Sequence, residues 1–184
     1  MAFVVRRKAL VHMSGGPRLR TPSELKASRR RRAHGCWGHL TVAPLWPLHG
    51  VNLGTLLRTC DAVGACLAVP RLPWVPEALA RGNTLRRRTC VHFTGPAIPW
   101  LVRQHEAGHR ILGVELADEA LRLADLPPAR EPTVAVLGHE QYGIPPEAME
   151  LLDAAVEIPM VGHGASLNVA VAGSLVLYKL AGLL

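Results

Sequence analysis

The chain has 184 residues, of which 49% are hydrophobic and 4% aromatic, and its formal net charge is +7 at pH 7. This length suits one domain with a sizeable core, and the composition excludes an intrinsically disordered protein. Because no apolar run reaches the roughly 18 residues that span a bilayer and no signal-peptide pattern opens the chain, we expect a soluble, cytoplasmic protein with no membrane association.

The positive charge is concentrated near the N-terminus. Residues 1–32 hold ten Lys or Arg and one acidic residue, whereas the other 152 residues hold eleven basic and thirteen acidic residues. The densest part is an arginine run formed by Arg29, Arg30, Arg31 and Arg32. A basic block beside a nearly neutral body indicates a polyanionic partner such as RNA. We therefore predict a basic, RNA-binding N-terminal arm over residues 1–38 and one domain over residues 39–184.

From residue 39 onward, short apolar segments alternate with amphipathic ones. The pattern predicts strands at residues 40–45, 65–69, 91–94, 111–116, 133–137 and 155–159. It predicts helices at residues 52–63, 77–80, 98–107, 145–152 and 166–180. Buried strands that alternate with helices are typical of an α/β fold, here an open, mostly parallel sheet with helices on both faces.

Cysteine spacing argues against a metal centre and against a disulfide framework. The four cysteines are Cys36, Cys60, Cys66 and Cys90, and they form no CxxC pair. Residues 34–39 hold two histidines and a cysteine, but no fourth ligand accompanies them. We expect reduced, mostly buried thiols and no bound metal.

Three polar segments interrupt the pattern where predicted strands end. In the first segment, Asn52 stands where a helix N-cap is expected, and Arg58 follows on the same helix. A capping role is sufficient to explain Asn52. An exposed arginine such as Arg58 needs no special role by itself.

The second segment follows the predicted strand at residues 133–137. Gly138 and Gly143 flank Glu140 there. Two glycines at the carboxyl end of a strand are typical of a ligand-binding loop in an open α/β sheet, because glycine lets the backbone approach a ligand closely. The chain has neither the GxGxxG fingerprint nor a P-loop, which argues against a dinucleotide-dependent oxidoreductase and a nucleoside triphosphatase.

The third segment follows the last predicted strand. It contains Met160, a glycine-rich loop and Ser166, which we expect to be the N-cap of the last helix. Asn168 falls in the first turn of that apolar helix, where a buried amide needs hydrogen-bond partners.

Taken in order, the three segments resemble the three sequence motifs of the SpoU (TrmH) family of RNA methyltransferases, in the SPOUT class. The matching patterns are Asn-x-Gly-x-x-x-Arg-Thr, then Gly-x-Glu-x-x-Gly, then Ile-Pro-Met followed by Ser-Leu-Asn-Val, within about residues 51–178. The resemblance implies an α/β fold with a deep trefoil knot, formed by the chain from about residue 133, although general topology rules argue against knots.

The resemblance also implies S-adenosyl-L-methionine as the cofactor, bound in the knot by backbone and apolar contacts. By motif position, the cofactor-binding residues are Leu137, Gly138, Ile158, Met160, Ser166 and Leu167. The implied reaction transfers a methyl group to a ribose 2′-hydroxyl of RNA.

Five residues match the catalytic positions of the family: Arg58, Asn52, Glu140, Ser166 and Asn168. The arginine is usually proposed as the base. Because a guanidinium holds its proton tightly, stabilisation of negative charge and a grip on the substrate phosphate are alternative roles. The resemblance implies that Asn52 and Glu140 orient Arg58, that Asn168 orders the knot loop or the ribose, and that the protein acts as a homodimer.

The sequence does not name the RNA. About 38 polar residues precede the first strand, too few for a separate recognition domain, so we favour tRNA over ribosomal RNA. The alternatives are a ribosomal RNA 2′-O-methyltransferase (including an antibiotic-resistance enzyme), a catalytically silent knotted RNA-binding protein, and a SPOUT enzyme that methylates a base nitrogen. The complete set of polar motif residues argues against the silent protein, and the Arg58 motif together with Ser-Leu-Asn-Val favours the ribose over a base.

Overall fold

A computed structural model of the chain describes residues 38–83, 90–164 and 166–184. The predicted arm over residues 1–38, with its four RNA-binding arginines, therefore lies almost wholly outside the described residues. The strands are β1 Leu40–Pro44, β2 Cys66–Pro70, β3 Val91–Thr94, β4 Arg110–Val114, β5 Leu121–Arg122, β6 Thr133–Leu137 and β7 Ala154–Glu157. The helices are α2 Gly50–Val63, α3 Val75–Gly82, α4 Ala97–Glu106, the 3-10 helix η1 Leu123–Asp125, α5 Pro146–Met149 and α6 Val169–Leu180.

The seven strands form one sheet in the order β3-β2-β1-β6-β4-β7-β5. Every pairing between neighbours in this sheet is parallel. The central strand β6 lies between β1 and β4, with Ala135 opposite both Val42 and Leu112. Because all strands run the same way, their carboxyl ends meet at one edge of the sheet, where ligands bind in open α/β folds.

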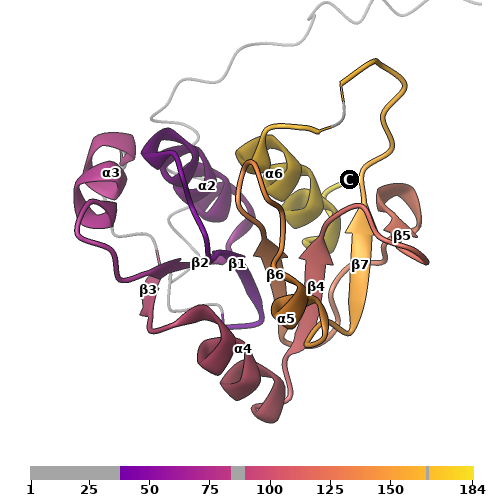
Figure 1. Cartoon of the computed structure of the whole chain (residues 1–184), viewed down its shortest axis with the longest axis horizontal. Helices are drawn as coiled ribbons and strands as arrows, with labels where there is room; N and C mark the ends of the chain where they lie inside the picture. Colours follow the sequence, from indigo (N-terminus) through magenta and orange to yellow (C-terminus); the bar gives the residue numbers. More distant parts are fainter. Residues whose placement is uncertain (1–37, 84–89, 165) are drawn as a thin grey trace, which may run out of the picture. The chain divides into compact units, whose positions relative to one another are not determined.

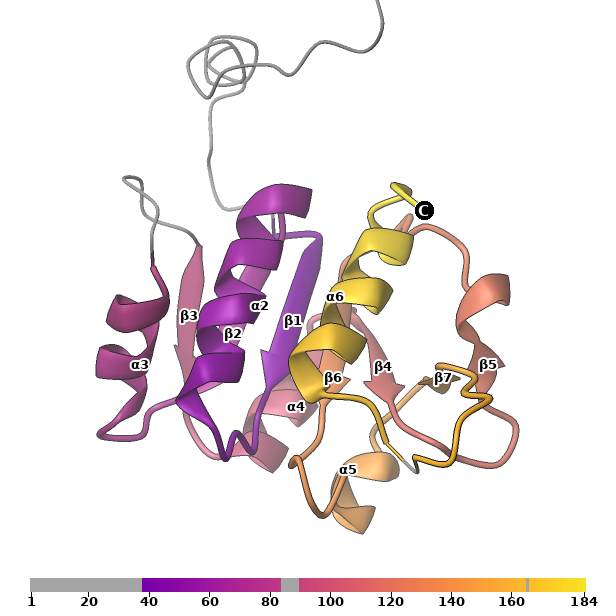
Figure 2. The ribbon, with the colours of Figure 1, turned by 90° about the horizontal axis from the view of Figure 1, so that it is seen from above.

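Helices cover both faces of this sheet (Figures 1 and 2). Helices α2, α3 and α6 lie side by side on one face, and α4 and α5 lie on the other. Strand β6 shows why this arrangement is stable: all five of its residues are buried, and alternate side chains enter different cores. Ala135 and Leu137 pack toward the α2/α6 side, whereas Val134 and Val136 pack with Leu101 of α4 and Ala148 of α5.

The predicted α/β sheet with helices on both faces is confirmed. Strands β3 and β6 have the predicted bounds, and β5, only two residues long, was not predicted. Helix α5 is shorter than the predicted 145–152 helix, because Asp153 is already tied to β4. The backbone N–H of Asp153 donates to Ile111 O at 2.8 Å, and the Asp153 carboxylate accepts from Ile111 N at 2.6 Å.

Helices α2 and α3 approach each other closely through two glycines. An ideal Cβ on Gly54 would lie only 2.7 Å from the Gly82 Cα. A backbone neighbour cannot rotate away as a side chain can, so a larger residue at this point must force the helices apart.

Gly54→Val is therefore expected to lower the free energy of unfolding by about 1–3 kcal/mol. For a domain of this size, that corresponds to a fall in melting temperature of roughly 2–4 °C for each kcal/mol. Thermal unfolding followed by circular dichroism measures the melting temperature. The matched control is Gly95→Val, since a Cβ on Gly95 meets nothing within 4 Å. An unchanged melting temperature for Gly54→Val would contradict the close packing.

Among the described residues, no helix is both long enough and apolar enough to cross a lipid bilayer.

Candidate active site

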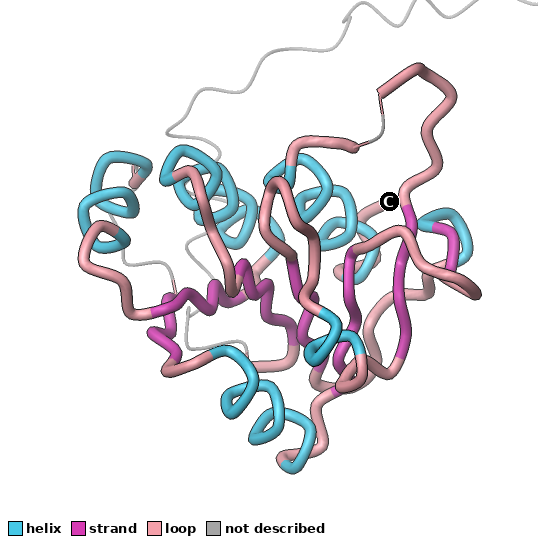
Figure 3. The backbone as a smooth tube through the Cα atoms, in the orientation of Figure 1, coloured by secondary structure: helices cyan, strands magenta, loops and turns pink. Residues whose placement is uncertain are grey.

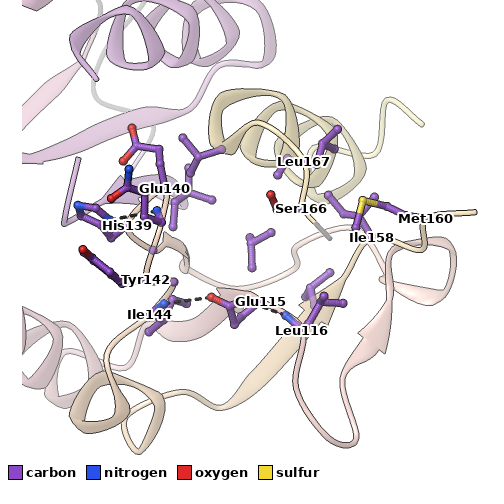
Figure 4. Close-up of a pocket in the computed structure, with 18 residues that line it drawn as sticks. Glu115, Leu116, His139, Glu140, Tyr142, Ile144, Ile158, Met160, Ser166 and Leu167 are labelled. Carbon is purple, nitrogen blue, oxygen red and sulfur yellow. Dashed lines mark hydrogen bonds between the residues drawn. The ribbon is translucent and has the colours of Figure 1, made fainter. Parts of the chain in front are cut away.

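A cavity of about 500 Å³ opens at the carboxyl ends of β4, β6 and β7. Its volume is within the range of small-molecule sites. The walls come from three places: Val114–Leu116 after β4, the loop of residues 137–144 after β6, and the segment that leads from β7 into α6. Figure 3 shows that segment as a loop, and Figure 4 shows its side chains facing those of the other two walls.

All six residues predicted to bind the cofactor line this cavity: Leu137, Gly138, Ile158, Met160, Ser166 and Leu167. Glu140 also lines it. Folding brings the first two of these six residues beside the other four, because about 20 residues separate Gly138 from Ile158 in the sequence. The cavity therefore joins the second and third polar segments.

The loop after β6 is closed tightly on itself. The backbone N–H of His139 donates to Gly143 O at 2.8 Å, and that of Gly143 donates to His139 O at 2.9 Å. Gly143 has a positive φ of 69°, which favours glycine. An ideal Cβ on Gly138 would lie 2.5 Å from Ile144 N and 2.6 Å from Gly143 O, so glycine is required at 138 for this turn.

Glu140 connects the loop to the start of α2. Its carboxylate accepts hydrogen bonds from the backbone N–H of Leu48 at 2.8 Å, from that of His49 at 3.1 Å, and from Asn52 Nδ2 at 2.9 Å. Partial burial alone would raise the pKa of Glu140, but these donors favour the charged form more strongly. The pKa of Glu140 is therefore lowered from its ordinary value.

The expected capping role of Asn52 is wrong. Helix α2 begins at Gly50 with His49 as its N-cap, and Asn52 is the third residue of the helix. The physical reason is Glu140, which satisfies the N–H groups of Leu48 and His49 from a distant loop and places a negative charge at the helix N-terminus. The side-chain amide of Asn52 therefore does not cap the helix and contacts other side chains instead. Asn52 is 5% exposed.

The expected cap of the last helix is also wrong. Helix α6 begins at Val169, and Asn168, not Ser166, is its N-cap. Asn168 Oδ1 accepts from the backbone N–H of Ala170 at 2.9 Å and from that of Val171 at 3.2 Å. Asn168 is exposed instead of buried within the helix. Because the Asn168 side chain satisfies two N–H groups of the first helical turn, helix α6 begins directly after Asn168 and later than predicted.

One chain of hydrogen bonds links all three polar segments. Asn168 Nδ2 donates to Asn52 Oδ1 at 3.1 Å, and Asn52 Nδ2 donates to Glu140 Oε1 at 2.9 Å. The structure thus brings together three of the five predicted catalytic residues. Ser166 lies at the cavity wall.

Arg58 stands apart from this chain. It is exposed on α2, does not line the cavity, and makes no hydrogen bond or ion pair with any described residue. The predicted orientation of Arg58 by Asn52 and Glu140 has no contact to support it, because those two side chains bind each other. Its guanidinium is available to a partner molecule.

Sequence reasoning assigned no site role to several lining residues, among them Glu115, His139 and Tyr142. Glu115, directly after β4, accepts from Ile144 N at 3.0 Å and from Leu116 N at 3.1 Å (Figure 4). The rings of His139 and Tyr142 stack with their centroids 4.8 Å apart. The position of Glu115 at the carboxyl end of a strand was a usable signal. The two rings lie between the second motif's fixed positions, and no local pattern marks them.

The lowered pKa of Glu140 predicts how stability depends on pH. A carboxylate whose pKa is depressed by folding stabilises the folded state above its unfolded pKa, and that contribution is lost as the pH falls through the folded pKa. Glu140→Gln should unfold more easily than wild type at pH 7, by about 1 kcal/mol. The difference should shrink in acid. Urea unfolding at neutral and acidic pH measures both, and an equal difference at both pH values would contradict the role of the charge.

Comparison with known proteins identifies the family of the motifs. The sequence pattern of the SpoU rRNA Methylase family matches residues 41–178. The tRNA (guanosine(18)-2'-O)-methyltransferase of Escherichia coli K12 is 35% identical over 133 residues, which make up 70% of this chain and 56% of that relative. This chain therefore spans little more than half the length of the relative.

Solved structures agree with this result. A crystal structure of the TrmH/SpoU tRNA modifying enzyme of A. aeolicus has a TM-score of 0.68 and 27% identity, and the match covers 80% of this chain and 76% of that one. The SpoU methyltransferase AviRb of Streptomyces viridochromogenes, solved in complex with AdoMet, has a TM-score of 0.63 and 25% identity. That match covers 84% of this chain and 63% of the other.

Proposed function

The chain belongs to the SpoU rRNA Methylase family, and on that premise we propose that it transfers a methyl group from S-adenosyl-L-methionine to a ribose 2′-hydroxyl of RNA. The observation that carries the proposal is the hydrogen-bonded chain Glu140–Asn52–Asn168. It joins the three motif segments beside one small-molecule cavity.

The cavity suits S-adenosyl-L-methionine by its volume and by the chemistry of its walls. Apolar side chains of Leu137, Ile158, Met160 and Leu167 offer a surface for the adenine ring, and Gly138 permits the tight turn that forms one wall of the cavity. Backbone groups and Ser166 supply the polar contacts. The cofactor, when bound, supplies an electrophilic methyl group carried by a sulfonium.

The protein's task is to align the 2′-oxygen with that methyl carbon. With the cofactor held by the residues that line the cavity, its sulfonium would supply the methyl group to the 2′-oxygen, and the hydroxyl proton would pass to water. Arg58 binds the adjacent RNA phosphate and stabilises negative charge on the oxygen, because a guanidinium is a poor base and a good bidentate donor. The lack of a hydrogen bond or ion pair between Arg58 and any described residue supports this role.

We propose tRNA as the substrate. The E. coli relative named above acts on guanosine 18 of tRNA, and the two sequences are 35% identical over the matched region. The arginines at positions 29–32 give an electrostatic, sequence-independent grip on the phosphates, which predicts strong dependence on salt. A tRNA substrate implies that the protein acts in the cytoplasm.

Two further features belong to this proposal. The chain from about residue 133 forms a trefoil knot that holds the cofactor, which agrees with the placement of β6 between β1 and β4. The protein acts as a homodimer, and apolar side chains left exposed at the start of α2 and α6 support it: Val51 is 77% exposed and Val171 is 44% exposed.

Methyl transfer from tritiated S-adenosyl-L-methionine tests the proposal. Unmodified tRNA and ribosomal RNA are incubated separately with the full chain, and label in the RNA is counted. We expect label in tRNA and little in ribosomal RNA. Label only in ribosomal RNA would show that ribosomal RNA, and not tRNA, is the substrate. Binding of the cofactor with no label in either RNA would favour the silent RNA-binding protein.

A further inference from the structure

A second group of reactive side chains lies far from the cavity. Cys66 begins β2, Cys90 directly precedes β3, and His92 is the second residue of β3. In the parallel β2/β3 pair, Leu67 is opposite Val91, and Leu67 N donates to Cys90 O at 2.9 Å. The same register sets Cys66 opposite Cys90. Side chains two residues apart on a strand share a face, so His92 joins the two cysteines.

The three side chains converge on one point. Cys66 Sγ and Cys90 Sγ are 3.0 Å apart, and Cys90 Sγ is 3.0 Å from His92 Nε2. All three ligand atoms lie within 4.8 Å of one another. The sulfur–sulfur distance is well beyond the roughly 2.05 Å of a disulfide bond. Two thiols with an imidazole nitrogen beside them match the ligand types of a zinc site.

We propose that Cys66, Cys90 and His92 bind one Zn²⁺ ion. Two sulfurs and one imidazole nitrogen are the donor set that zinc prefers. With zinc–sulfur bonds of about 2.3 Å, tetrahedral geometry sets two sulfur ligands about 3.8 Å apart. The sulfurs here reach that separation by a movement of less than about 1 Å. Water completes the tetrahedron on the side of His92, which is exposed, whereas Cys66 is buried.

The position in the fold indicates what the ion does. Strand β3 is an edge strand of the described sheet, paired only with β2. Zinc bound at the amino ends of β2 and β3 ties the edge strand to its neighbour. The cofactor cavity lies at the carboxyl ends of other strands, at the opposite edge. Zinc therefore stabilises the fold and leaves cofactor affinity unchanged.

The test uses the full chain, reduced and stripped of metal with a chelator. Co²⁺ is titrated as a spectroscopic probe, because cobalt bound to thiolates shows a charge-transfer band, and Zn²⁺ is then added to displace it. We expect one equivalent of Co²⁺ with a thiolate band that Zn²⁺ abolishes. Cys90→Ser and His92→Ala should each weaken binding at least tenfold, since loss of even an outer-shell partner costs about 10- to 100-fold.

Two controls make the result specific. His105→Ala removes an exposed histidine on α4 whose Nε2 lies 3.6 Å from Asp153 Oδ1, and Cys36→Ser removes a thiol outside the described residues. Both should keep the band. Absence of a thiolate band in the reduced wild type would overturn the proposal, as would a band that survives in both Cys90→Ser and His92→Ala. A Cys66–Cys90 disulfide with no metal uptake after reduction would also overturn it.

Discussion

Arg58→Ala is expected to lower the rate of methyl transfer to RNA by about 10²–10³-fold, the usual cost of removing a group that stabilises transition-state charge. Affinity for S-adenosyl-L-methionine should not change, because Arg58 does not line the cavity. Stability should not change either, since the side chain is exposed and has no partner among the described residues. Single-turnover assays measure the rate, titration calorimetry measures the affinity, and thermal unfolding measures the stability.

Two further variants sharpen this result. Arg103→Ala removes another exposed arginine, on α4, and should leave the rate near that of wild type. Arg58→Lys keeps the charge but loses the planar, bidentate donor, so it should restore only part of the rate. Full activity of Arg58→Ala would show that the exposed guanidinium has no part in the reaction.

Gly138→Ala is expected to weaken binding of S-adenosyl-L-methionine by about 10- to 100-fold, the equivalent of an overpacking cost of about 1–3 kcal/mol. The new Cβ would meet the backbone of Gly143 and Ile144, which cannot move without opening the turn. Opening it also strains the hydrogen bond from Ile144 N to Glu115 at 3.0 Å. The cavity wall then changes shape.

Calorimetry with the cofactor alone measures this change without any RNA. Gly162→Ala is the matched control, because it lies in the loop between β7 and α6 and a Cβ there meets nothing within 4 Å. Its affinity should equal that of wild type. Normal affinity in Gly138→Ala would place the cofactor somewhere other than this cavity.

The sequence was sufficient to predict most of the sheet and two of the three walls of the cavity. Strand β6 is a run of five buried residues, four of them apolar, and Gly138 follows directly. The local sequence therefore predicts both where this strand lies and which of its ends binds a ligand. The resemblance then supplied the cofactor, which no apolar pattern specifies. All six predicted cofactor residues line the cavity.

The errors have a common physical cause, which is contact between distant segments. Local rules place Asn52 at the start of α2, but Glu140, 88 residues away from Asn52, satisfies the helix N-terminus instead. Asn168 is drawn into the same network by its bond to Asn52. Likewise, Cys66 and Cys90 are 24 residues apart and match no metal-binding spacing, and only the pairing of β2 with β3 brings them together.

The central claim is that the methyl group goes to a ribose 2′-oxygen, and the most direct measurement is alkaline hydrolysis of tRNA labelled by this protein. Alkali cleaves RNA through attack of the 2′-oxygen on the neighbouring phosphate, so a 2′-O-methylated linkage resists cleavage. We predict that the label is recovered in alkali-stable dinucleotides. Label recovered in mononucleotides would show methylation of a base and would contradict the account.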